Sequence, residues 1–342
     1  MKKLSLLNKI IYLINNAFAL LLLLSIAIPF IQPKSFPLIS VLSLAVPILI
    51  FAHLIFILYW ILNGVKKQFL LSSICILLTI IFSYFPYKFN GKTKKDDDSF
   101  TILNYNVHLF NIYGLLDTEN IPLKISSLIA RNKPDIVTFQ EYADDQVDLF
   151  DFPYKHIVTG TRKNFGQAIF SKYPIINRGS LDFLNSSNNA IFVDIIKDND
   201  TLRIYNLHLE SFGIKVDNIN LNEKDSKRLL DRLSRSFVKQ QRQVENFIRH
   251  RENCKYKIIT CGDFNNTAYS WAYRNIREDM KDSFIEAGKG FGETYSFQRY
   301  PLRIDFILVD EKFEVIKHKN FDVKLSDHEP ILAKLRLLNF PD

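Results

Sequence analysis

Three long apolar segments in the first quarter of the chain constrain its fold more than any other feature. They cover residues 10–31, 37–63 and 68–86, and none of them contains Asp, Glu, Lys or Arg. A helix needs about 20 predominantly apolar residues to cross the hydrocarbon core of a bilayer. The sequence therefore predicts three transmembrane helices, which form a membrane anchor over residues 1–87 with the lipid bilayer as its partner.

The few polar residues inside these segments give no evidence of transport. Asn15, Asn16 and His53 are the main ones. We interpret them as interfacial residues or as helix–helix hydrogen-bonding residues, because that is the commoner role of such side chains in a membrane. Segments with no ionisable residue besides His53 offer no conduction path, which argues against a transporter or channel.

The charge pattern specifies the orientation of the anchor only weakly. An N-terminus inside the cell leaves five Lys residues on each side of the membrane, so the positive-inside count is a draw. The first helix usually dominates the choice, and three crossings then carry the C-terminus out of the cytoplasm. We therefore expect a multi-pass membrane protein whose C-terminal domain is extracytoplasmic.

The positive charge of the chain belongs almost entirely to the anchor. The sequence has a net charge of +8, from 44 Lys and Arg against 36 Asp and Glu. Residues 1–98 hold ten of these basic residues and three of the acidic ones, which leaves 34 and 33 in residues 99–342. A basic chain would usually suggest a nucleic-acid partner, but a nearly neutral C-terminal domain removes that argument.

A charged stretch at residues 88–98, KFNGKTKKDDD, predicts a linker before a second domain over residues 99–342. This domain alternates between strand-like and helix-like patterns. The predicted strands are Phe100–Val107, Ile136–Phe139, Gln167–Ser171, Ala190–Ile196, Leu202–Leu209, Tyr256–Thr260 and Ile304–Val309, and the predicted helices are Ile121–Arg131 and 222–250. The pattern predicts one α/β domain with a large core.

Polar and acidic residues gather where the predicted strands end. The first strand ends with Asn104 and Asn106, whose alternation places both side chains on one face. Glu141 follows the second strand, where a carboxylate is well placed to hold a hard metal ion. His208 lies near the end of a later strand. Each has an ordinary alternative: core hydrogen bonding for the two Asn residues, a solvated loop acid for Glu141 and a satisfied core histidine for His208.

More specific signals lie in the last third of the chain. The stretch KIITCGDFNN ends an apolar strand with Asp263 and Asn265, an acid and an amide that suit proton transfer and the positioning of water or an oxyanion. A structural Asx-turn is the alternative. Asp305 lies inside the apolar strand RIDFILVD and needs a partner there. In LSDHEPI, Asp327 and His328 offer a histidine that one carboxylate can orient while another holds a metal ion.

Taken in order, the motifs N-x-N-V, Q-E, N-L-H, G-D-F-N, R-I-D-F-I and S-D-H resemble those of the endonuclease/exonuclease/phosphatase superfamily, which has the deoxyribonuclease-I-like fold. The resemblance covers residues 99–340. It implies a four-layer α/β sandwich, in which two packed β-sheets are flanked by helices and the site lies at one edge. It also implies a hydrolase of phosphoester bonds that uses Mg²⁺ or Mn²⁺ as cofactor.

The resemblance also implies roles for the matching residues. The metal site would comprise Asn106, Glu141 and Asp327, with Glu141 as the principal ligand. The catalytic set would comprise His208, Asp263, Asn265, Asp305 and His328. In this set Asp263 and Asn265 would activate water and bind a phosphate oxygen, His208 would contact the scissile phosphate, and Asp305 would pair with His328. Asn104 and Arg162 are the predicted substrate contacts, and Arg162 stands in for a second phosphate contact that has no clear counterpart here.

The sequence leaves the substrate open. A phospholipid or sphingolipid head group suits a tethered enzyme, because an anchor raises its effective concentration at the bilayer. A nucleotide and a nucleic acid, cut by a nuclease acting on DNA or RNA, are the alternatives. A catalytically inactive, membrane-tethered binding module is the opposing class of protein, and the complete set of acids, amides and histidines argues against it. The sequence points to no protein partner.

Overall fold

The computed structural model describes residues 4–64, 67–84, 86–89, 91, 98–143, 149–159, 165–213, 223–297 and 300–338. The chain divides by compactness into two units. The first comprises residues 1–86, 220–241 and 267–274, and the second comprises residues 87–219, 242–266 and 275–342. Residues 90 and 92–97 of the predicted linker lie outside the described residues, and the predicted domain boundaries stay a prediction.

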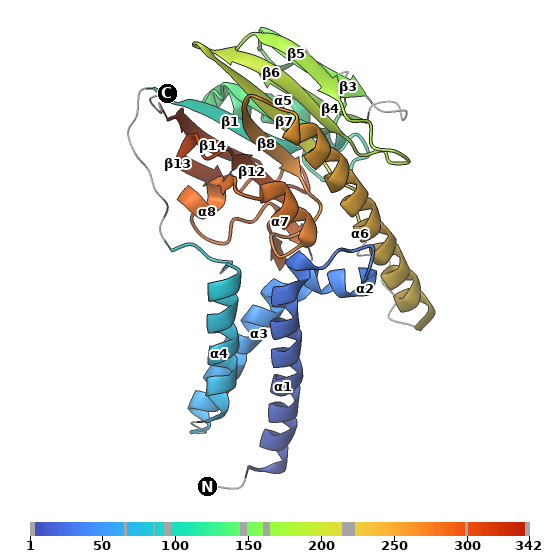
Figure 1. The fold of residues 1–342 in the computed structure, drawn as a ribbon, viewed down its shortest axis with the longest axis vertical. Coiled ribbons are helices and arrows are strands. Elements are labelled where there is room, and N and C mark those ends of the chain that lie inside the picture. The colour runs from blue at the N-terminus through green and yellow to red at the C-terminus, as the bar shows by residue number, and fades with distance from the viewer. Residues whose placement is uncertain are drawn as a thin grey trace. The chain divides into compact units, whose positions relative to one another are not determined.

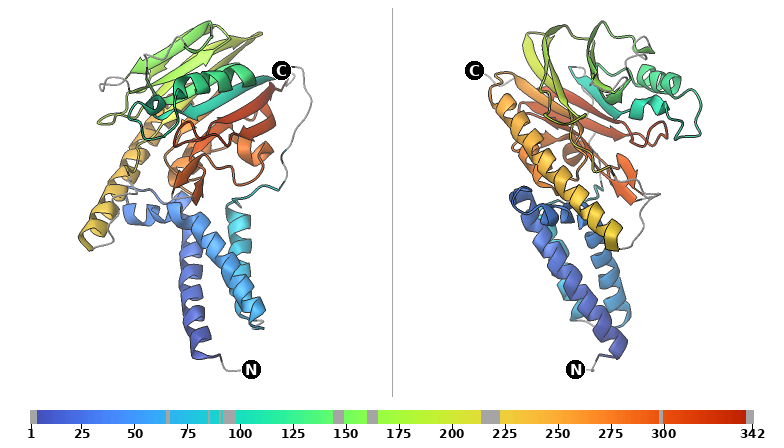
Figure 2. Two further views of the ribbon diagram at one scale, coloured as in Figure 1. Left: turned by 180° about the vertical axis from the view of Figure 1, so that it is seen from behind. Right: turned by 90° about the vertical axis from the view of Figure 1, so that its right-hand side faces the viewer.

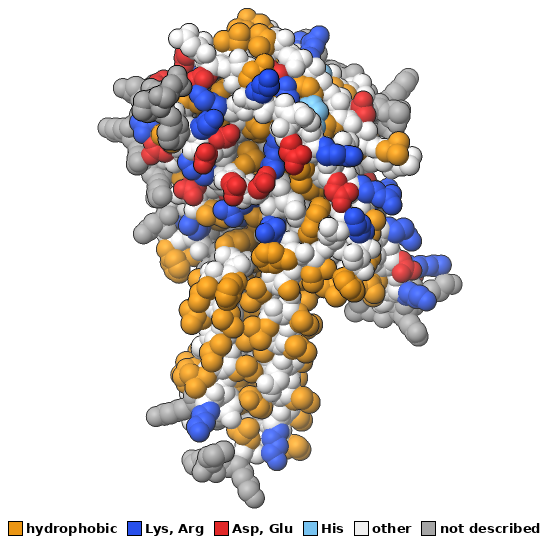
Figure 3. All heavy atoms as spheres, in the orientation of Figure 1, with side chains coloured by type: hydrophobic (Ala, Val, Ile, Leu, Met, Phe, Trp, Pro, Cys, Tyr) orange, Lys and Arg blue, Asp and Glu red, His pale blue; other side chains and the backbone are white. Residues whose placement is uncertain are grey.

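The N-terminal segment of the first unit is helical (Figure 1). Its elements are α1 (Leu6–Ala27), the 3₁₀ turn η1 (Ile28–Phe30), α2 (Pro37–Ser40), α3 (Leu42–Leu62) and α4 (Gln68–Phe82). Among the described residues, two helices are long and apolar enough to cross a membrane, Leu6–Phe30 and Leu42–Leu62. Large apolar side chains cover their surface, as Figure 3 shows, and the exposed fractions of Leu6 and Leu62 are 77% and 76%.

The third predicted transmembrane helix is shorter than expected. The segment 68–86 forms α4 over only 15 residues, Gln68–Phe82. At about 1.5 Å per residue, such a helix extends roughly 22 Å, which is less than the ~30 Å of hydrocarbon. It ends because Ser83 leaves the helical backbone region (φ −137°, ψ −135°). The expectation of three helices of membrane-spanning length is therefore wrong, since the described residues contain two such helices and one shorter apolar helix.

A cluster of four buried polar side chains joins α1, α3 and α4. The Nδ2 of Asn15 donates a hydrogen bond to the Oγ of Ser72 (2.8 Å), and the Nδ1 of His53 lies 2.9 Å from the same oxygen. Trp60 donates from its Nε1 to the Oδ1 of Asn15 (3.0 Å). These contacts give Asn15 and His53 helix–helix hydrogen bonds, which explains polar residues within apolar helices.

The second unit is built on two six-stranded sheets. The first has the strand order β13-β14-β1-β2-β4-β3, the second has β5-β6-β7-β8-β12-β9, and β10 pairs with β11. Their bounds are β1 Phe100–Asn106, β2 Ile136–Tyr142, β3 Tyr154–Thr159, β4 Gly166–Ser171, β5 Ile175–Ser180, β6 Ala190–Lys197, β7 Asp200–His208, β8 Lys257–Asp263, β9 Lys281–Asp282, β10 Tyr295–Phe297, β11 Tyr300–Leu302, β12 Asp305–Val309, β13 Phe313–Asn320 and β14 Ile331–Leu337.

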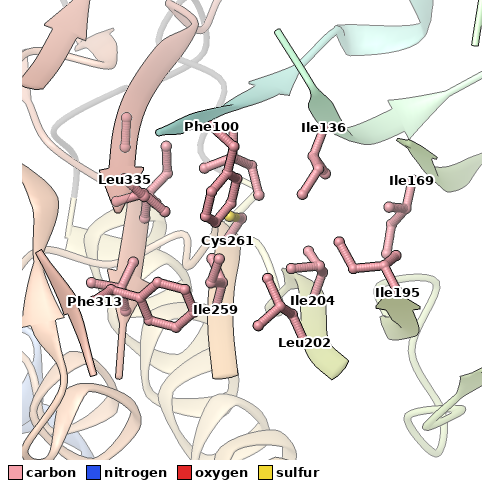
Figure 4. Close-up of a cluster of buried hydrophobic side chains, with 14 of the residues drawn as sticks. Phe100, Ile136, Ile169, Ile195, Leu202, Ile204, Ile259, Cys261, Phe313 and Leu335 are labelled. Carbon is pink, nitrogen blue, oxygen red and sulfur yellow. The ribbon is translucent and has the colours of Figure 1, made fainter. Parts of the chain in front are cut away.

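The two sheets face each other across a shared apolar core, which Figure 4 shows. Ile136 of the first sheet and Ile204 of the second are both fully buried in it. The core forms because β1, β2, β7 and β8 carry near-continuous apolar runs, as strands covered on both faces do.

Helices cover the outer faces of both sheets, as Figure 2 shows. Helix α5 (Ile121–Asn132) buries Ile121, Ile125 and Leu128, spaced by three or four residues, in a second apolar cluster against the first sheet. Helix α6 (Glu223–Glu252) places Phe247 edge-on against Tyr205 of β7, with ring centroids 5.0 Å apart. The remaining helical elements are η2 (His108–Asn111), α7 (Trp271–Arg277) and α8 (Ser283–Ala287). The predicted α/β sandwich of two packed sheets flanked by helices is confirmed.

The sandwich makes a prediction at Gly262, whose backbone has φ +149°. A Cβ built on it would lie 1.9 Å from the carbonyl oxygen of Leu207 on the neighbouring strand β7. We expect Gly262→Ala to lower the free energy of unfolding by about 2–3 kcal/mol, because strain and overpacking add, and to lower Tm by roughly 5–10 °C. Thermal unfolding of the purified full chain measures this.

The matched control is Gly114→Ala. Gly114 also has a positive φ (+64°), but nothing lies within 4 Å of the position that its Cβ would take. This substitution should therefore cost only the backbone strain, about 1–2 kcal/mol. Equal losses at the two positions would contradict the steric argument for Gly262.

Candidate active site

The site is assembled by the carboxyl ends of two parallel strand pairs, one from each sheet. β1 runs parallel to β2, with Asn106 opposite Gln140, and β7 runs parallel to β8, with His208 opposite Asp263. β12 pairs with β8 so that Asp305 also lies opposite Asp263. Because parallel strands end at the same edge of a sheet, this register brings polar residues far apart in sequence into one row. β2 and β8 run further than predicted, so Asp263 ends a strand and is not a loop residue.

The carboxylate of Asp263 is the centre of this row. Its Oδ2 accepts hydrogen bonds from the Nδ2 of Asn106 (3.0 Å) and the Nδ2 of Asn265 (3.2 Å), and its Oδ1 accepts one from the backbone N–H of Asn265 (2.7 Å). The Nε2 atoms of His208 and His328 each lie 3.7 Å from Oδ2. Burial raises the pKa of Asp263 to about 8. Four of the predicted site residues therefore surround a fifth.

His328 is oriented by Asp305. Its Nδ1 lies 2.8 Å from the Oδ2 of Asp305, and both side chains are buried. Burial alone would lower the pKa of His328, but the negative charges of Asp305 and Asp263 outweigh it and raise that pKa well above the usual value. His208 differs, since its burial lowers its pKa to about 3 and keeps the ring neutral. These two imidazoles therefore differ, because His328 is favoured as a cation and His208 is held neutral.

Glu141 reaches the site through a β-bulge. The pairing of β2 with β4 shifts register between Gln140 and Tyr142, and Glu141 is the extra residue, with φ +48°. Its Oε1 lies 3.4 Å from the Nδ2 of Asn106 and 3.7 Å from the Nε2 of His208. Burial raises its pKa. A regular strand would have placed this side chain on the face of the sheet opposite Gln140, whereas the bulge turns it towards the site.

Asp327 lies at the exposed rim of the site, where its side chain is 42% exposed. The Nδ1 of His108 lies 3.2 Å from its Oδ1, to which Ser326 also donates a hydrogen bond (3.1 Å). Partial burial opposes ionisation of Asp327, but the hydrogen bond from His108 and the charge of His328 hold its pKa below the usual range. His108 was not among the residues that the sequence predicted for the site.

The donors of this site fit a divalent metal ion. Four carboxylates meet within it, those of Glu141, Asp263, Asp305 and Asp327, against two histidines with a raised pKa. Among the described residues, the Oδ1 of Asp305 is a buried oxygen without a hydrogen-bond partner. Such a group of carboxylate oxygens, one of them buried without a hydrogen-bond partner, is the kind of donor set that a hard cation prefers.

Two groups of residues could hold the ion. Asp263, Asp305 and His328 bring ligand-type atoms within 4.8 Å of one another. The predicted metal set is different: Asn106, Glu141 and Asp327. Since Asp305 already holds the Nδ1 of His328, the first group is arranged as a chain for orienting a proton donor or acceptor. The predicted metal set and the predicted catalytic roles stay predictions.

A layer of buried amides lies beneath the site and joins the two sheets. The Nε2 of Gln140 donates to the Oδ1 of Asn104 (2.8 Å) and to the Oδ1 of Asn206 (2.6 Å). Asn206 in turn donates to the carbonyl oxygen of Phe139 (2.7 Å), and Gln167 donates to the carbonyl oxygen of Asn206 (3.0 Å). All four amides are almost completely buried, as such a network requires.

The two predicted substrate contacts have different outcomes. Asn104 is fully buried in the amide layer, where its Oδ1 also accepts a hydrogen bond from Thr138 (2.8 Å), so this position gives no support to direct contact with a substrate. Its predicted role stays a prediction. Arg162 lies outside the described residues. The alternation of Asn104 and Asn106 was a correct signal for one polar face, but it could not show which of the two reaches the open end.

A cavity adjoins His208. Its volume is about 390 Å³, and residues of β3, β4 and the loop 182–189 line it together with His208. Phe165 and Phe183 contribute aromatic surface, and Ser187 and Asn188 contribute hydroxyl and amide groups. The described lining contains no Lys or Arg. Sequence patterns gave no signal for this cavity, because its wall comes from a loop without a recognisable motif.

Comparisons with known proteins identify the family and the fold of this chain. Residues 103–328 match the family described as the Endonuclease/Exonuclease/phosphatase family, and residues 8–84 match a domain of unknown function, DUF8431. No curated protein matches the chain.

Solved structures share the fold. A family protein from Leptotrichia buccalis is 18% identical, with a TM-score of 0.52, and the match covers 70% of this chain and 100% of that one. A family protein from Bacteroides vulgatus is 19% identical (TM-score 0.52; 70% and 99% covered). D. rerio TDP2 complexed with a single-strand DNA product is 14% identical (TM-score 0.53; 70% and 100% covered).

Since the family match spans more than half of the sequence, the chain belongs to the endonuclease/exonuclease/phosphatase family and is a hydrolase of phosphoester bonds.

Proposed function

We propose that the protein is a membrane-anchored phosphodiesterase that depends on a divalent metal ion and cleaves its substrate by attack of water. The observation that supports this most is the position of Asp263. Its Oδ2 lies 3.7 Å from the Nε2 of His208 and 3.7 Å from that of His328, distances too long for hydrogen bonds. Both Nε2 atoms can therefore form hydrogen bonds to a phosphate group placed beside the carboxylate.

The residues of the chain divide the chemistry between them. Mg²⁺ or Mn²⁺ held by Asn106, Glu141 and Asp327 would neutralise charge on the phosphate. Asp263 in its ionised form accepts the proton of the attacking water, and a pKa raised to about 8 gives this carboxylate the basicity that the step requires. Asn265 fixes the direction of that carboxylate through its backbone N–H and its side-chain amide.

The two histidines act on the phosphate. His328, held through its Nδ1 by Asp305, directs its Nε2 towards the reacting group and donates a charge-assisted hydrogen bond to an oxygen. His208, which is neutral, contacts a second phosphate oxygen. Donors fixed in advance stabilise the transition state without reorganisation, which is the main source of catalysis in such sites.

Among the substrates that the sequence leaves open, we propose a phospholipid or sphingolipid head group first, because the apolar helices would hold the enzyme at a bilayer. A nuclease is the second candidate, and the cavity beside His208 favours it. Two aromatic side chains together with amides, hydroxyls and the carboxylate of Asp182 suit an uncharged ring with a hydrogen-bonding edge, such as a nucleobase. D. rerio TDP2, which shares the fold, was crystallised with a single-strand DNA product.

Helix α4 decides the orientation of the enzyme. With the N-terminus in the cytoplasm, two crossings would return the second unit to the cytoplasm and three would export it. α4 is short, but it is joined to α1 and α3 by the hydrogen bonds of Ser72. We propose that the whole apolar segment 68–86, with α4 as its helical part, forms a third crossing of the bilayer and that the catalytic unit is extracytoplasmic.

The proposed chemistry is tested with bis(p-nitrophenyl) phosphate and the full chain purified in detergent. We expect hydrolysis with Mg²⁺ or Mn²⁺ and none after EDTA treatment, because the carboxylates cannot replace the charge of the cation. Asp263→Ala and His328→Ala should each lower kcat by about 10²-fold or more. Asp151→Ala, at an exposed carboxylate of the same unit, should have no effect.

Turnover without metal, or full activity in both active-site variants, would rule out this mechanism. If the enzyme is active, the same preparation offered single-stranded DNA and phosphatidylcholine vesicles distinguishes the two substrate classes.

The pairing of Asp305 with His328 makes a separate prediction. Asp305→Asn keeps the size of the side chain but removes the charge that orients the imidazole, so kcat should fall by about 10–100-fold with little change in KM. Steady-state kinetics measure the two constants, with Asp151→Asn as the control. A rise in KM at unchanged kcat would show that Asp305 serves substrate binding and not the chemical step.

Orientation is tested by fusing alkaline phosphatase, which is active only outside the cytoplasm, to the C-terminus. We expect an active fusion in the full chain. Deletion of residues 68–82 should abolish its activity, because α4 is then no longer available as the third crossing. A fusion that is inactive in the full chain but active after the deletion would reverse the proposed topology.

A further inference from the structure

A strained turn follows strand β1 directly. Four consecutive residues other than glycine, His108 to Asn111, have φ angles of 43°, 52°, 53° and 62°. The left-handed conformation costs about 1–2 kcal/mol for each such residue, and runs of it are avoided. Strain of this kind persists only where the surrounding structure enforces it, and it occurs most often at functional sites.

Packing and hydrogen bonds hold this turn in place. Leu109 and Phe110 are buried, and the ring of Phe110 packs against Tyr142, with centroids 5.5 Å apart. The backbone N–H of Phe110 donates to the carbonyl oxygen of Val107 (2.8 Å), and that of His108 donates to the Oδ1 of Asn106 (3.1 Å). The turn is therefore a fixed part of the domain.

The turn places an imidazole among the acidic residues of the site. The Nδ1 of His108 lies 3.2 Å from the Oδ1 of Asp327, and its side chain is 27% exposed. The negative charge of Glu141 also acts on His108. Asp327 and Glu141 belong to the predicted metal set, whereas none of the catalytic roles proposed above requires His108.

We propose that His108 is an imidazole ligand of the divalent metal ion, next to Asp327, and that it makes the site prefer a first-row transition ion such as Mn²⁺ to Mg²⁺. The inference rests on the metal site of the proposed function. Two atoms bound to one ion at about 2.1 Å and nearly at right angles are roughly 3 Å apart, close to the separation observed here. Mg²⁺ prefers oxygen ligands and sheds its water reluctantly, whereas a nitrogen ligand favours transition ions.

The structure also allows a competing role, in which His108 only donates a hydrogen bond to Asp327 and stays outside the coordination shell. The two roles differ in one measurable respect. A ligating ¹⁴N nucleus couples to the unpaired electrons of Mn²⁺, and a more distant ring couples far more weakly. Pulsed electron paramagnetic resonance detects this coupling without any measurement of turnover.

The experiment loads the full chain, in detergent, with Mn²⁺ alone. We expect strong ¹⁴N modulation in the wild type and its loss in His108→Gln, with ¹⁵N-labelled histidine changing the coupling as the isotope requires. His156→Gln is the matched control, because His156 lies on β3 and interacts with the carbonyl oxygen of Gly179 (3.3 Å). This variant should keep the modulation. Equal Tm values confirm that each variant is folded.

Metal affinity provides a second measurement. We expect the wild type to bind Mn²⁺ at least ten-fold more tightly than Mg²⁺ by competition titration. His108→Asp, which replaces nitrogen by a carboxylate, should move the ratio of the two Kd values towards one. This substitution tests the chemistry of the ligand. If the role of His108 were purely structural, the substitution would weaken the binding of both ions alike.

The outcomes separate the two proposals. Bound Mn²⁺ with no ¹⁴N modulation, or modulation that survives in His108→Gln, would overturn the role of His108 and leave the phosphodiesterase proposal standing. Failure of the wild-type chain to bind Mn²⁺ or Mg²⁺ at all would instead overturn the metal site of the proposed function itself.

Discussion

The burial of one carboxylate, Asp263, is the constraint on which the site depends. A buried acid is costly unless other groups compensate for it. The protein meets this demand with amide donors from Asn106 and Asn265 and with the nearby rings of His208 and His328. These partners come from both sheets, so the geometry of the site is fixed only when the two sheets are packed together. Folding and assembly of the site are thus one event.

The amide layer beneath the site explains how two apolar sheets can meet around polar chemistry. The side chain of Asn206, on the second sheet, donates to the carbonyl oxygens of Phe139 and Ala168 on the first. Apolar packing alone specifies the distance between sheets but tolerates sliding. The hydrogen bonds that Asn206 makes to Gln140 and to the carbonyl oxygen of Phe139 are directional, so sliding of one sheet past the other would break them. We infer that this layer sets the alignment that Asp263 requires.

The sequence predicted the sandwich and most of the residues that meet at the site, because both depend on local patterns. Apolar runs identify buried strands, and Asp263 and Asp305 stand out as acids within such runs.

His108 was not predicted because its position depends on a left-handed backbone conformation, which the residue types of that segment do not indicate. Strands β3 and β5 were missed because their side chains are partly exposed and lack clear alternation. The early end of α4 was missed because hydropathy measures composition and not the backbone angles at Ser83.

The β-bulge at Glu141 has a consequence for how such a site could arise. Strand β2 contains one residue more than its partner β4 can pair with, yet Phe139 and Tyr142, on either side, remain fully buried. The extra residue therefore adds a carboxylate at the site while both neighbouring rings stay in the core. In evolutionary terms, insertion of a single codon at the end of a strand can introduce a carboxylate into an existing scaffold. Chemical novelty and fold stability can then be selected almost independently.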